Sequence, residues 1–515
     1  MRRRDVFGRE TVALPTAAES SALDRAARER WGIPERVLME DAGRSAAMLL
    51  HRLYPSGRVL ALVGSGHNGG DALVLLRNLR AWGREVAFVR AGRLPEPAPM
   101  HGFDLPELPA EGAELALAGA DVLVDGLLGT GSSGAPRDST AALIRALNAC
   151  GRPVVALDLP SGVDATSGAV PGDAVRAAVT LSFGWPKVGL MLHPARAYCG
   201  RLLALEIGFP PLDPGAAGAE LVTPAWAQAR LPVRGATAHK GSAGRVLIVA
   251  GRAGMAGAAV IAAEAAARAG AGLVHVASAA DNRVVLQSAV PEAIFRDRAA
   301  QGALSAAGVE AMLLGPGVGA EDAEGSAVLE RALERTGGLP SVLDADALTW
   351  LAARPALLRD LARDRALVLT PHPGEMQRLT GLTIDQIRAH PIETARELAA
   401  ASDCVVLLKG QPSVVAAPGL PVLVNSTGSS DVAAAGMGDQ LGGTITALLA
   451  AGAPAREAAA LGLFYAGRAA DLAGRGRSLS PRHVSAALHL AYDAPGAESP
   501  PFGFPFITFD QPPPR

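Results

Sequence analysis

Short apolar runs alternate with helical segments along most of the chain. From Val59 onward the runs VLALV, EVAFV, ADVLVDG, PVVALDL and AVTLSF are rich in β-branched residues, and Ala- and Leu-rich stretches such as DALVLLRNLRAWG separate them. Strands that alternate with helices in this way predict a parallel sheet with helices on both faces. The pattern therefore predicts an α/β fold.

The alternation is interrupted once. Residues 209–218 (FPPLDPGAAG) are rich in Pro and Gly without apolar periodicity, and a second series then runs through RVLIVAG, AGLVHVAS, AMLLGPG, SVLDAD, ALVLTPHPGE and CVVLLKG to a long helical region. The two series share no repeat that we detect. We expect two different α/β domains, at residues 1–212 and 222–493, and an irregular tail at 494–515. The length of 515 residues agrees, because one core rarely organises more than about 300.

Composition and charge exclude several classes of protein. The 48 basic and 50 acidic residues are interspersed, so no basic stripe predicts nucleic-acid binding. The most apolar helical stretch carries Glu264 and Arg268, which indicates a buried helix and no membrane span. Asp5 interrupts the apolar stretch that a signal peptide would need after the N-terminal arginines. The three cysteines are far apart, and we expect a reducing cytoplasmic location.

Three motifs of the first domain follow predicted strands. The segment from Gly64 to Asp71 joins a strand to a helix, where backbone amides favour an anion, although a purely structural tight turn explains it equally well. Asp125 and Asp158 each end a later strand, and each on its own is explained as a cap of the following turn. Because parallel strands end at one edge, the three motifs together predict a ligand site there.

The strings GHNGGD, DGLLGTG, DLPSGVDATSG and PKVG resemble the NAD(P)HX epimerase family over about residues 10–210. This resemblance implies a three-layer Rossmann-like domain that binds K⁺ and a hydrated nicotinamide cofactor, NADHX or NADPHX. It implies Asn68, Asp125 and Ser161 as potassium ligands, for which hard oxygen atoms are suited. Asp158 is our candidate for the acid or base at the hydroxyl-bearing carbon, followed by Lys187. The expected substrate contacts are His67, Asn68, Gly69, Gly70, Asp71, Gly129, Thr130, Gly131, Ser132, Ser133, Gly134, Ala135 and Asp158.

The family string NNGGDG is changed here at two positions. His67 replaces the usual Asn, where it would alter substrate contacts, and Ala72 replaces the usual Gly, where only packing is expected to differ.

In the second domain, the run from Gly436 to Asp439 (GMGD) opens a helix. Amides of Gly436 and Gly438 at the helix N-terminus would neutralise charge on a transferring phosphoryl group, while Asp439 accepts the proton of an attacking hydroxyl. On its own, GMGD is equally an ordinary helix start with an acidic residue in its first turn. Further loops follow predicted strands, so we expect one large pocket.

The ordered set HKG, GPGVG, DADAL, LTPHPGE, LKG and AGMGD resembles the NAD(P)HX dehydratase family, a branch of the ribokinase fold, over about residues 225–490. The resemblance implies a second three-layer domain, which uses ADP with Mg²⁺. It implies that hydrated NAD(P)H contacts Ala258, Gly317, His372 and Asp439. It implies that the adenine nucleotide contacts Lys409, Gly410, Gln411, Pro412, Ser413 and Gly438. His372 is alternatively a loop histidine whose hydrogen bonds are structural. The run SSDVAAAGMGD departs from the family's NPGMATGGTGD before its Gly-x-Gly-Asp core.

The function expected from both resemblances is repair of hydrated nicotinamide cofactors. One domain would interconvert the R and S epimers, and the other would dehydrate the S epimer while ADP becomes AMP and phosphate. Two alternatives stay open: a ribokinase-like kinase of a small alcohol that uses ATP, and a first domain that is a non-catalytic binding module. Apolar helical surfaces favour a homo-oligomer.

Overall fold

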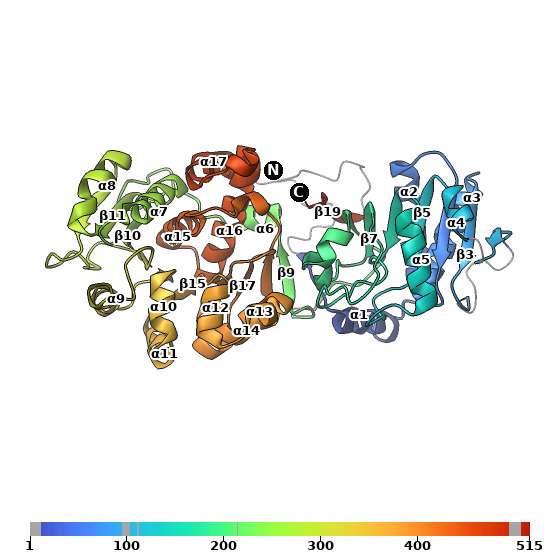
Figure 1. The fold of residues 1–515 in the computed structure, drawn as a ribbon, viewed down its shortest axis with the longest axis horizontal. Coiled ribbons are helices and arrows are strands. Elements are labelled where there is room, and N and C mark those ends of the chain that lie inside the picture. The colour runs from blue at the N-terminus through green and yellow to red at the C-terminus, as the bar shows by residue number, and fades with distance from the viewer. Residues whose placement is uncertain (1–11, 95–102, 111–112, 214, 494–505, 515) are drawn as a thin grey trace. The chain divides into compact units, whose positions relative to one another are not determined.

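The computed structural model describes residues 12–94, 103–110, 113–213, 215–493 and 506–514. The chain divides into two compact units, residues 1–220 with 498–515, and residues 221–497 (Figure 1). Each unit is built on a mainly parallel sheet, so the α/β prediction is confirmed. Within the described ranges, no helix combines the length and apolar character needed to cross a membrane.

The sheet of the first unit has the strand order β19-β8-β7-β6-β5-β2-β3-β4. All neighbouring pairs are parallel except β19 with β8. The strands are β2 (Val59–Val63), β3 (Val86–Arg90), β4 (Glu107–Leu108), β5 (Val122–Gly126), β6 (Val154–Leu157), β7 (Val179–Phe183), β8 (Arg201–Leu205) and β19 (Ile507–Gln511). The short strand β1 (Val12–Ala13) pairs with β9 (Ala219–Val222).

Successive side chains of β2 point to opposite faces of the sheet and lie in two separate apolar cores. Val59, Ala61 and Val63 lie in a core shared with α2 and α3, whereas Leu60 and Leu62 lie in a core shared with α4 and α5. A strand whose residues are all buried is expected only when helices cover both faces. The unit is therefore three-layered, with helices α1 (Ala17–Glu29), α2 (Glu35–Leu53), α3 (His67–Ala81), α4 (Ala113–Ala118) and α5 (Asp138–Ala149), and the 3₁₀ turns η1 (Val188–Met191) and η2 (Ala195–Tyr198).

The prediction of an irregular tail at 494–515 is wrong for residues 507–511, which form β19 against the edge strand β8. The Arg201 guanidinium donates to both carboxylate oxygens of Asp510, at 2.8 and 2.6 Å. Ile507 is buried in the core beneath α2 and α3. The tail thus covers an edge strand whose backbone groups would otherwise be unpaired. Residues 494–505 lie outside the described ranges.

The sheet of the second unit has the order β18-β17-β16-β15-β14-β13-β10-β11-β12, parallel except where β17 pairs with β16 and β18. Its strands are β10 (Arg245–Val249), β11 (Leu273–Ser278), β12 (Ile294–Asp297), β13 (Ala311–Leu314), β14 (Ser341–Leu343), β15 (Leu367–Leu369), β16 (Val405–Leu408), β17 (Val414–Ala416) and β18 (Val422–Asn425). The strand β10 lies between β13 and β11, because the chain passes to β11 and β12 before it crosses to β13.

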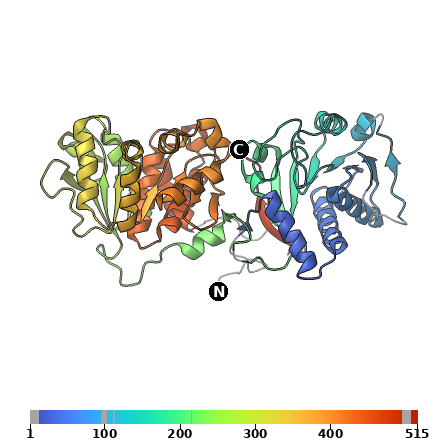
Figure 2. The same cartoon turned by 90° about the horizontal axis from the view of Figure 1, so that it is seen from below.

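Helices cover both faces of this sheet as well (Figures 1 and 2). Ala311 and Leu313 of β13 lie in the core formed with α7, α15, α16 and α17, while Met312 and Leu314 are equally buried on the other face. The helices are α6 (Pro224–Arg230), α7 (Ala256–Ala269), α8 (Arg283–Ala289), α9 (Ala323–Arg335), α10 (Asp346–Ala352), α11 (Pro355–Asp364), α12 (Pro373–Thr380), α13 (Ile384–Ala389), α14 (Pro391–Ser402), α15 (Met437–Ala450), α16 (Ala455–Ala473) and α17 (Pro481–Asp493). The 3₁₀ turns are η3 (Ala280–Asn282), η4 (Ser430–Val432) and η5 (Gly476–Ser478).

The pairing of β19 with β8 predicts that Ile507→Ala destabilises the first unit. Truncation of a buried isoleucine at a sheet edge costs about 2 kcal/mol, which corresponds to roughly 4–8 °C in the melting temperature of a unit of this size. Scanning calorimetry of the full chain measures the change. Pro514→Ala alters an exposed residue of the same tail and is the control. Equal melting temperatures for the two variants would contradict the structural role of β19.

Candidate active sites

The first candidate site lies where the strand order of the first unit reverses. The strand β2 has β3 on one side and β5 on the other, so the loops that follow β2 and β5 diverge above the sheet. Gly64, which follows β2, donates its N–H to the Gly126 carbonyl at the end of β5, at 2.9 Å. In open α/β sheets, ligands bind outside the carboxyl ends of the strands at this point.

Glycines in the loop after β2 have two different roles. A Cβ at Gly69 would lie 2.0 Å from the Gly64 carbonyl oxygen, and one at Gly64 would lie 1.9 Å from the Leu127 oxygen. The chain's own packing therefore requires these two glycines, as the tight-turn explanation predicts. At Gly66, immediately before α3, a Cβ would meet nothing within 4 Å. Open space for a ligand thus lies beside Gly66.

Asn68, Asp125 and Ser161 lie together beneath this loop. The Ser161 Oγ donates to Asp125 Oδ1 at 2.6 Å, and its N–H donates to Oδ2 at 2.8 Å. The Asn68 amide donates to the Leu128 carbonyl at 2.8 Å, and the Leu128 N–H donates to Ser161 Oγ at 2.9 Å. The structure therefore brings the three predicted potassium ligands into one buried network.

Two features of this network fit a bound cation. The Asn68 Oδ1 atom is buried and accepts no hydrogen bond, which is unusual for a buried polar atom because desolvation without a partner costs free energy. Asp125 is fully buried, and its burial raises its pKa to about 6 although Ser161 and Leu127 donate hydrogen bonds to it. A K⁺ ion would supply both the missing partner of Asn68 and a positive charge beside Asp125.

Asp158 forms an ion pair with Lys187 at the carboxyl ends of β6 and β7. Lys187 is 2% exposed and also donates from Nζ to the Phe183 carbonyl at 3.0 Å. Asp158 itself has a left-handed backbone, with φ of 63°. Such a conformation is uncommon for a residue other than glycine and concentrates at functional sites. The two sequence candidates for proton transfer are therefore partners, rather than alternatives.

Some of the remaining residues predicted to contact substrate lie near the Asp158–Lys187 pair, and others lie away from it. A Cβ at Gly129 would lie 3.3 Å from Asn68 Cβ and 4.0 Å from Asp158 Oδ2, so the partly exposed loop 129–135 begins beside both. Burial raises the pKa of Asp71 well above its usual range, and the nearby Asp158 raises it further. His67 points away from the buried network, since its ring is mostly exposed and lies 2.8 Å from Glu35.

The second candidate site lies at the corresponding reversal between β10 and β13. The Arg252 N–H, after β10, donates to the Gly317 carbonyl, after β13, at 2.6 Å. A Cβ at Gly317 would lie 3.4 Å from the Ala258 Cβ in the first turn of α7. The structure therefore brings together Gly317 and Ala258, two of the residues predicted to contact the substrate.

Close packing of α7 against α15 brings Asp439 to the same edge. A Cβ at Gly443 would lie 2.2 Å from the Ala262 carbonyl oxygen, so only glycine allows the two helices to approach this closely. Asp439 lies in the first turn of α15. Burial raises its pKa to about 7, with a further increase from Asp344 and a decrease from Lys409. A carboxyl that titrates near neutral pH is suited to accept a proton from a hydroxyl.

Lys409 is partly buried between two carboxylates, with its side chain 22% exposed. Its Nζ lies 2.8 Å from Asp344 Oδ1 and 3.8 Å from Glu375 Oε2. Burial by itself lowers the pKa of Lys409, but Asp344, Glu375 and Asp439 outweigh this effect and raise it. Asp344 and Glu375 were not among the predicted site residues, although the strings DADAL and LTPHPGE contain them. Their positions directly after strands were the signal that could have identified them.

The predicted nucleotide loop, 409–413, lies beside the start of α15. A Cβ at Gly438 would lie 3.4 Å from Lys409 Nζ and equally far from Asp344 Oδ2. The Gly410 N–H donates to Ser413 Oγ at 3.1 Å, which closes a tight turn after Lys409. A partly buried ammonium group that faces a glycine at a helix N-terminus is an arrangement that stabilises phosphate.

One nitrogen of the His372 ring accepts structural hydrogen bonds, and the other lies on the exposed side of the ring. Its Nδ1 accepts the N–H groups of Gly374 and Glu375 at 2.9 and 3.3 Å, so the ring caps α12. The alternative prediction, a loop histidine whose hydrogen bonds are structural, therefore holds for Nδ1. The opposite atom, Nε2, lies 3.5 Å from Glu375 Oε1 on a half-exposed ring. That edge of the ring is accessible to a ligand.

Carboxylates of the second site are candidate ligands of a nucleotide-bound cation. Among the described residues, no three His, Cys, Asp or Glu side chains form a metal cage. Mg²⁺ retains several waters and is usually held by one or two carboxylates together with substrate phosphates. Glu375 and Asp344 are the carboxylates nearest to Lys409 and fit that role.

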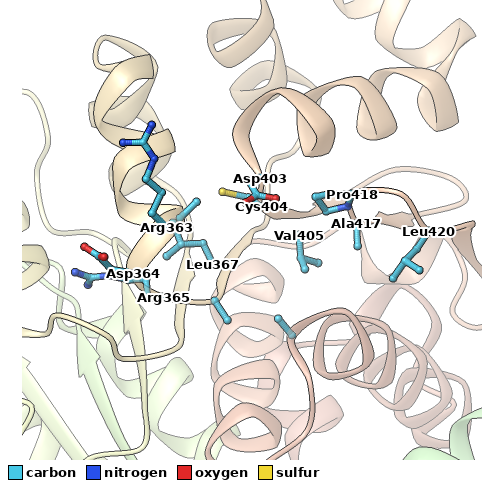
Figure 3. A pocket seen from close by; sticks show the side chains of 13 residues that line it. Arg363, Asp364, Arg365, Leu367, Asp403, Cys404, Val405, Ala417, Pro418 and Leu420 are labelled. Atoms are coloured by element: carbon cyan, nitrogen blue, oxygen red, sulfur yellow. The ribbon is translucent and has the colours of Figure 1, made fainter.

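A hollow of about 580 Å³ lies at the other edge of the second unit's sheet (Figure 3). Its lining includes Leu367 and Val405, the first residues of β15 and β16, together with Ala417 at the end of the antiparallel β17. Parallel strands begin at this edge, whereas the predicted site residues follow their carboxyl ends. The hollow contains none of the predicted site residues.

Known families match both units. The family described as NAD(P)H-hydrate dehydratase matches residues 246–489, and the family described as YjeF-related protein N-terminus matches residues 35–189. A bifunctional NAD(P)H-hydrate repair enzyme of Moorella thermoacetica is 38% identical over 500 residues, which cover 90% of this chain and 93% of the relative. The corresponding enzyme of Mycobacterium leprae is 39% identical over 478 residues, with the same coverage.

Solved structures each match part of the chain. The ADP/ATP-dependent NAD(P)H-hydrate dehydratase of Bacillus subtilis, co-crystallised with ATP and Mg²⁺, is 28% identical. The match covers 53% of this chain and 96% of that chain, with a TM-score of 0.46. The yeast protein YNL200c is 21% identical over 39% of this chain and 91% of that chain, with a TM-score of 0.34. The predicted fold class, a Rossmann-like unit followed by a ribokinase-like unit, is confirmed by the family matches and the two sheets.

The raised pKa of Asp439 predicts that Asp439→Asn stabilises the second unit at pH 8. The folded carboxyl ionises near pH 7 and the unfolded one near 3.8, so the wild-type protein loses stability as the pH rises between these values. The amide has no such dependence. We expect a gain in melting temperature of about 2 °C or more at pH 8, or ~1 kcal/mol, and a smaller gain at pH 5.

Scanning calorimetry at the two pH values makes this comparison. Asp360→Asn changes an exposed carboxylate of α11 and is the control. If Asp439→Asn is less stable than wild type at pH 8, burial of the ionised Asp439 carboxylate does not destabilise the folded protein.

Proposed function

The chain belongs to the family of bifunctional NAD(P)H-hydrate repair enzymes, and from this we propose that it restores hydrated NADH and NADPH in two steps. The first unit, with its domain at residues 1–212, interconverts the R and S epimers of NAD(P)HX. The second, with its domain at 222–493, dehydrates the S epimer with an adenine nucleotide. The observation that carries this proposal is Asp439 at the start of α15, beside the partly buried Lys409.

In the second unit, the Asp439 carboxylate accepts the proton of the ring hydroxyl as the hydroxyl oxygen attacks the terminal phosphorus of ADP. The bond from that phosphorus to the bridging oxygen breaks, and AMP leaves. The phosphate ester then eliminates: the C–O bond breaks, a proton leaves the adjacent carbon, and the dihydronicotinamide double bond forms. Phosphorylation is needed because hydroxide is a poor leaving group and phosphate is a good one.

The other residues of the second site hold the nucleotide. Lys409 neutralises phosphate charge, and its ion pair with Asp344 fixes the ammonium group in place. The helix N-terminus at Gly438 adds backbone dipoles at the transferring group. Mg²⁺, held by phosphate oxygens with Glu375 or Asp344, would neutralise further charge on the nucleotide. The nucleotide loop 409–413 and the accessible edge of His372 complete the contacts proposed for ADP and substrate.

In the first unit, Asp158 is the proposed proton-transferring group at the hydroxyl-bearing carbon. Its ion pair with Lys187 holds the carboxylate in one orientation at the carboxyl edge. The loop 129–135 and the start of α3, from His67 to Asp71, are the proposed contacts of the dinucleotide, with the exposed His67 at the rim and open space for the ligand beside Gly66. K⁺ at Asn68, Asp125 and Ser161 would supply a fixed positive charge under the phosphates.

We predict that the chain recovers NADPH completely from a mixture of both NADPHX epimers with ADP and Mg²⁺. Asp439→Asn is expected to lower the rate at least 100-fold, because the general base is lost. In the wild type the rate should rise with pH up to about 7, since the base must be ionised. NADPH absorbance at a series of pH values, with ADP and in parallel with ATP, measures these effects.

Two comparisons separate the activities. Asp360→Asn, which changes an exposed carboxylate, should recover NADPH at the wild-type rate. Recovery of only the S epimer would refute epimerisation by the first unit. If neither nucleotide supports recovery, phosphorylation of a small alcohol by ATP replaces dehydration as the function of the second unit.

We also predict that epimerisation requires K⁺. Replacement of KCl by tetramethylammonium chloride at equal ionic strength should lower the epimerisation rate at least 10-fold, because Asn68 Oδ1 and Asp125 then lack their cation. Chromatographic separation of the epimers without nucleotide measures the rate. Asn78→Ala, elsewhere on α3, is a control that should keep the K⁺ response, whereas Asn68→Ala should lose it. Equal rates in the two salts would exclude a functional K⁺ site.

A further inference from the structure

Helix α1 is fixed beside the Asp158–Lys187 pair at its first residue. The Ala17 N–H donates to Thr166 Oγ1 at 3.0 Å, and Thr166 lies in the loop that follows Asp158. The Val188 N–H donates to the Pro15 carbonyl at 3.0 Å, directly after Lys187. The start of the helix is therefore bonded to both loops that carry the ion pair. No sequence motif of the first unit had indicated a role for this helix.

The last turn of α1 is connected to the opposite side of the same site. Arg28 pairs with Glu35 at 2.7 Å, and Glu35 pairs with His67 at 2.8 Å. His67 is the first residue of α3, which carries the proposed potassium ligand Asn68. The helix thus spans the edge of the first unit from the loop after β6 to the start of α3. Both views of the fold show α1 at one edge of that unit (Figures 1 and 2).

Asp24 is the acidic residue on the inner face of this helix. It is half-buried, it precedes the fully buried Ala27 by three residues, and its neighbour Arg25 is exposed. No described residue donates a hydrogen bond to Asp24 or forms an ion pair with it. Its carboxyl therefore has no structural partner that would explain an acidic residue at this position.

The charged groups that face Asp24 are those of the site. Burial raises the pKa of Asp24; Lys187 lowers it, Asp158 raises it, and Arg28 and His67 lower it. The fully buried Asp71 in turn is affected by both Asp158 and Asp24. Asp24 is thus within electrostatic reach of Asp158, Lys187 and the α3 residue Asp71, although 134 residues of sequence separate it from Asp158.

We propose that Asp24 is the second proton-transferring carboxyl of the first site, and that it acts with Asp158 on the hydroxyl-bearing ring carbon. This proposal rests on the proposed epimerase activity and adds to it a catalytic residue. Inversion at one carbon needs a proton donor for the departing hydroxyl and a proton acceptor for the arriving water. Two carboxyl groups in different environments, on different elements, supply both roles.

The step balances without a further reactant. Protonated Asp24 gives its proton to the ring hydroxyl, the C–O bond breaks, water leaves, and the ring nitrogen's electron pair forms a C=N bond. A water molecule then adds to the other face, a new C–O bond forms, and the π electrons return to nitrogen. The Asp158 carboxylate takes the proton released by that water. Solvent returns a proton from Asp158 to Asp24, and nothing is oxidised or reduced.

The test is Asp24→Asn in the full chain with K⁺ present and no nucleotide. We expect kcat for epimerisation to fall 100-fold or more in both directions, with KM changed less than threefold. The wild-type rate should decline as the pH rises and Asp24 loses its proton, and this decline should disappear in the variant. Asp24→Glu should recover part of the rate. In H₂¹⁸O, the wild type should place ¹⁸O in the product epimer above the non-enzymatic background.

Controls separate this proposal from the function on which it rests. Glu29→Gln makes the same chemical change on an exposed residue of α1 and should epimerise at the wild-type rate. ADP-dependent dehydration of the S epimer should be normal in all three variants. A wild type without epimerase activity refutes the proposed function; an active wild type with an equally active Asp24→Asn refutes only the role of Asp24. Epimerisation without ¹⁸O uptake refutes the hydroxyl-transfer step.

Discussion

A lysine paired with a buried carboxylate, at the carboxyl edge of a parallel sheet, is the interaction around which both candidate sites are built. Lys187 pairs with Asp158 in the first unit, and Lys409 pairs with Asp344 in the second. Removal of two charges from water costs several kcal/mol for each ion, and the attraction between them offsets this cost only when the geometry is good. Apolar side chains would make the same edge at least as stable. The charged pairs are therefore explained by chemistry rather than by folding.

Close approach of the backbone creates the space in which these pairs lie. Gly69 lets the start of α3 pass against the end of β2, and Gly443 lets α7 pack against α15. Each contact brings a helix N-terminus to the reversal point of its sheet, where the dipole and the unpaired amides face the ligand. The hollow at the opposite edge of the second unit is lined by none of the residues that meet at this reversal point.

Several carboxyl groups of the two candidate sites have a raised pKa. Burial raises the pKa of Asp24, Asp71, Asp125 and Asp439, and each of these groups lies beside the carboxyl edge of its sheet. Such groups destabilise the folded chain when they are ionised. Under the proposed function, these carboxyls lie where a proton moves or a cation binds, so the lost stability and the proposed chemistry have the same physical origin, which is desolvation.

The sequence by itself determined the two α/β units and the family, and it predicted site residues at the carboxyl edges of both sheets. It did so because the pattern of apolar residues that predicts a strand lies within a few neighbouring residues. The residues of a turn such as the one from Gly64 to Asp71 are also consecutive in the chain. Only the tertiary structure decided which distant groups meet. Four contacts or positions join segments whose sequences do not predict that they meet. They are the Arg201–Asp510 pair, the Lys187–Asp158 pair, the two carboxylates around Lys409 and the position of Asp24. A side chain's partner across the sheet edge depends on strand order and helix packing, and neither leaves a periodic pattern in the chain.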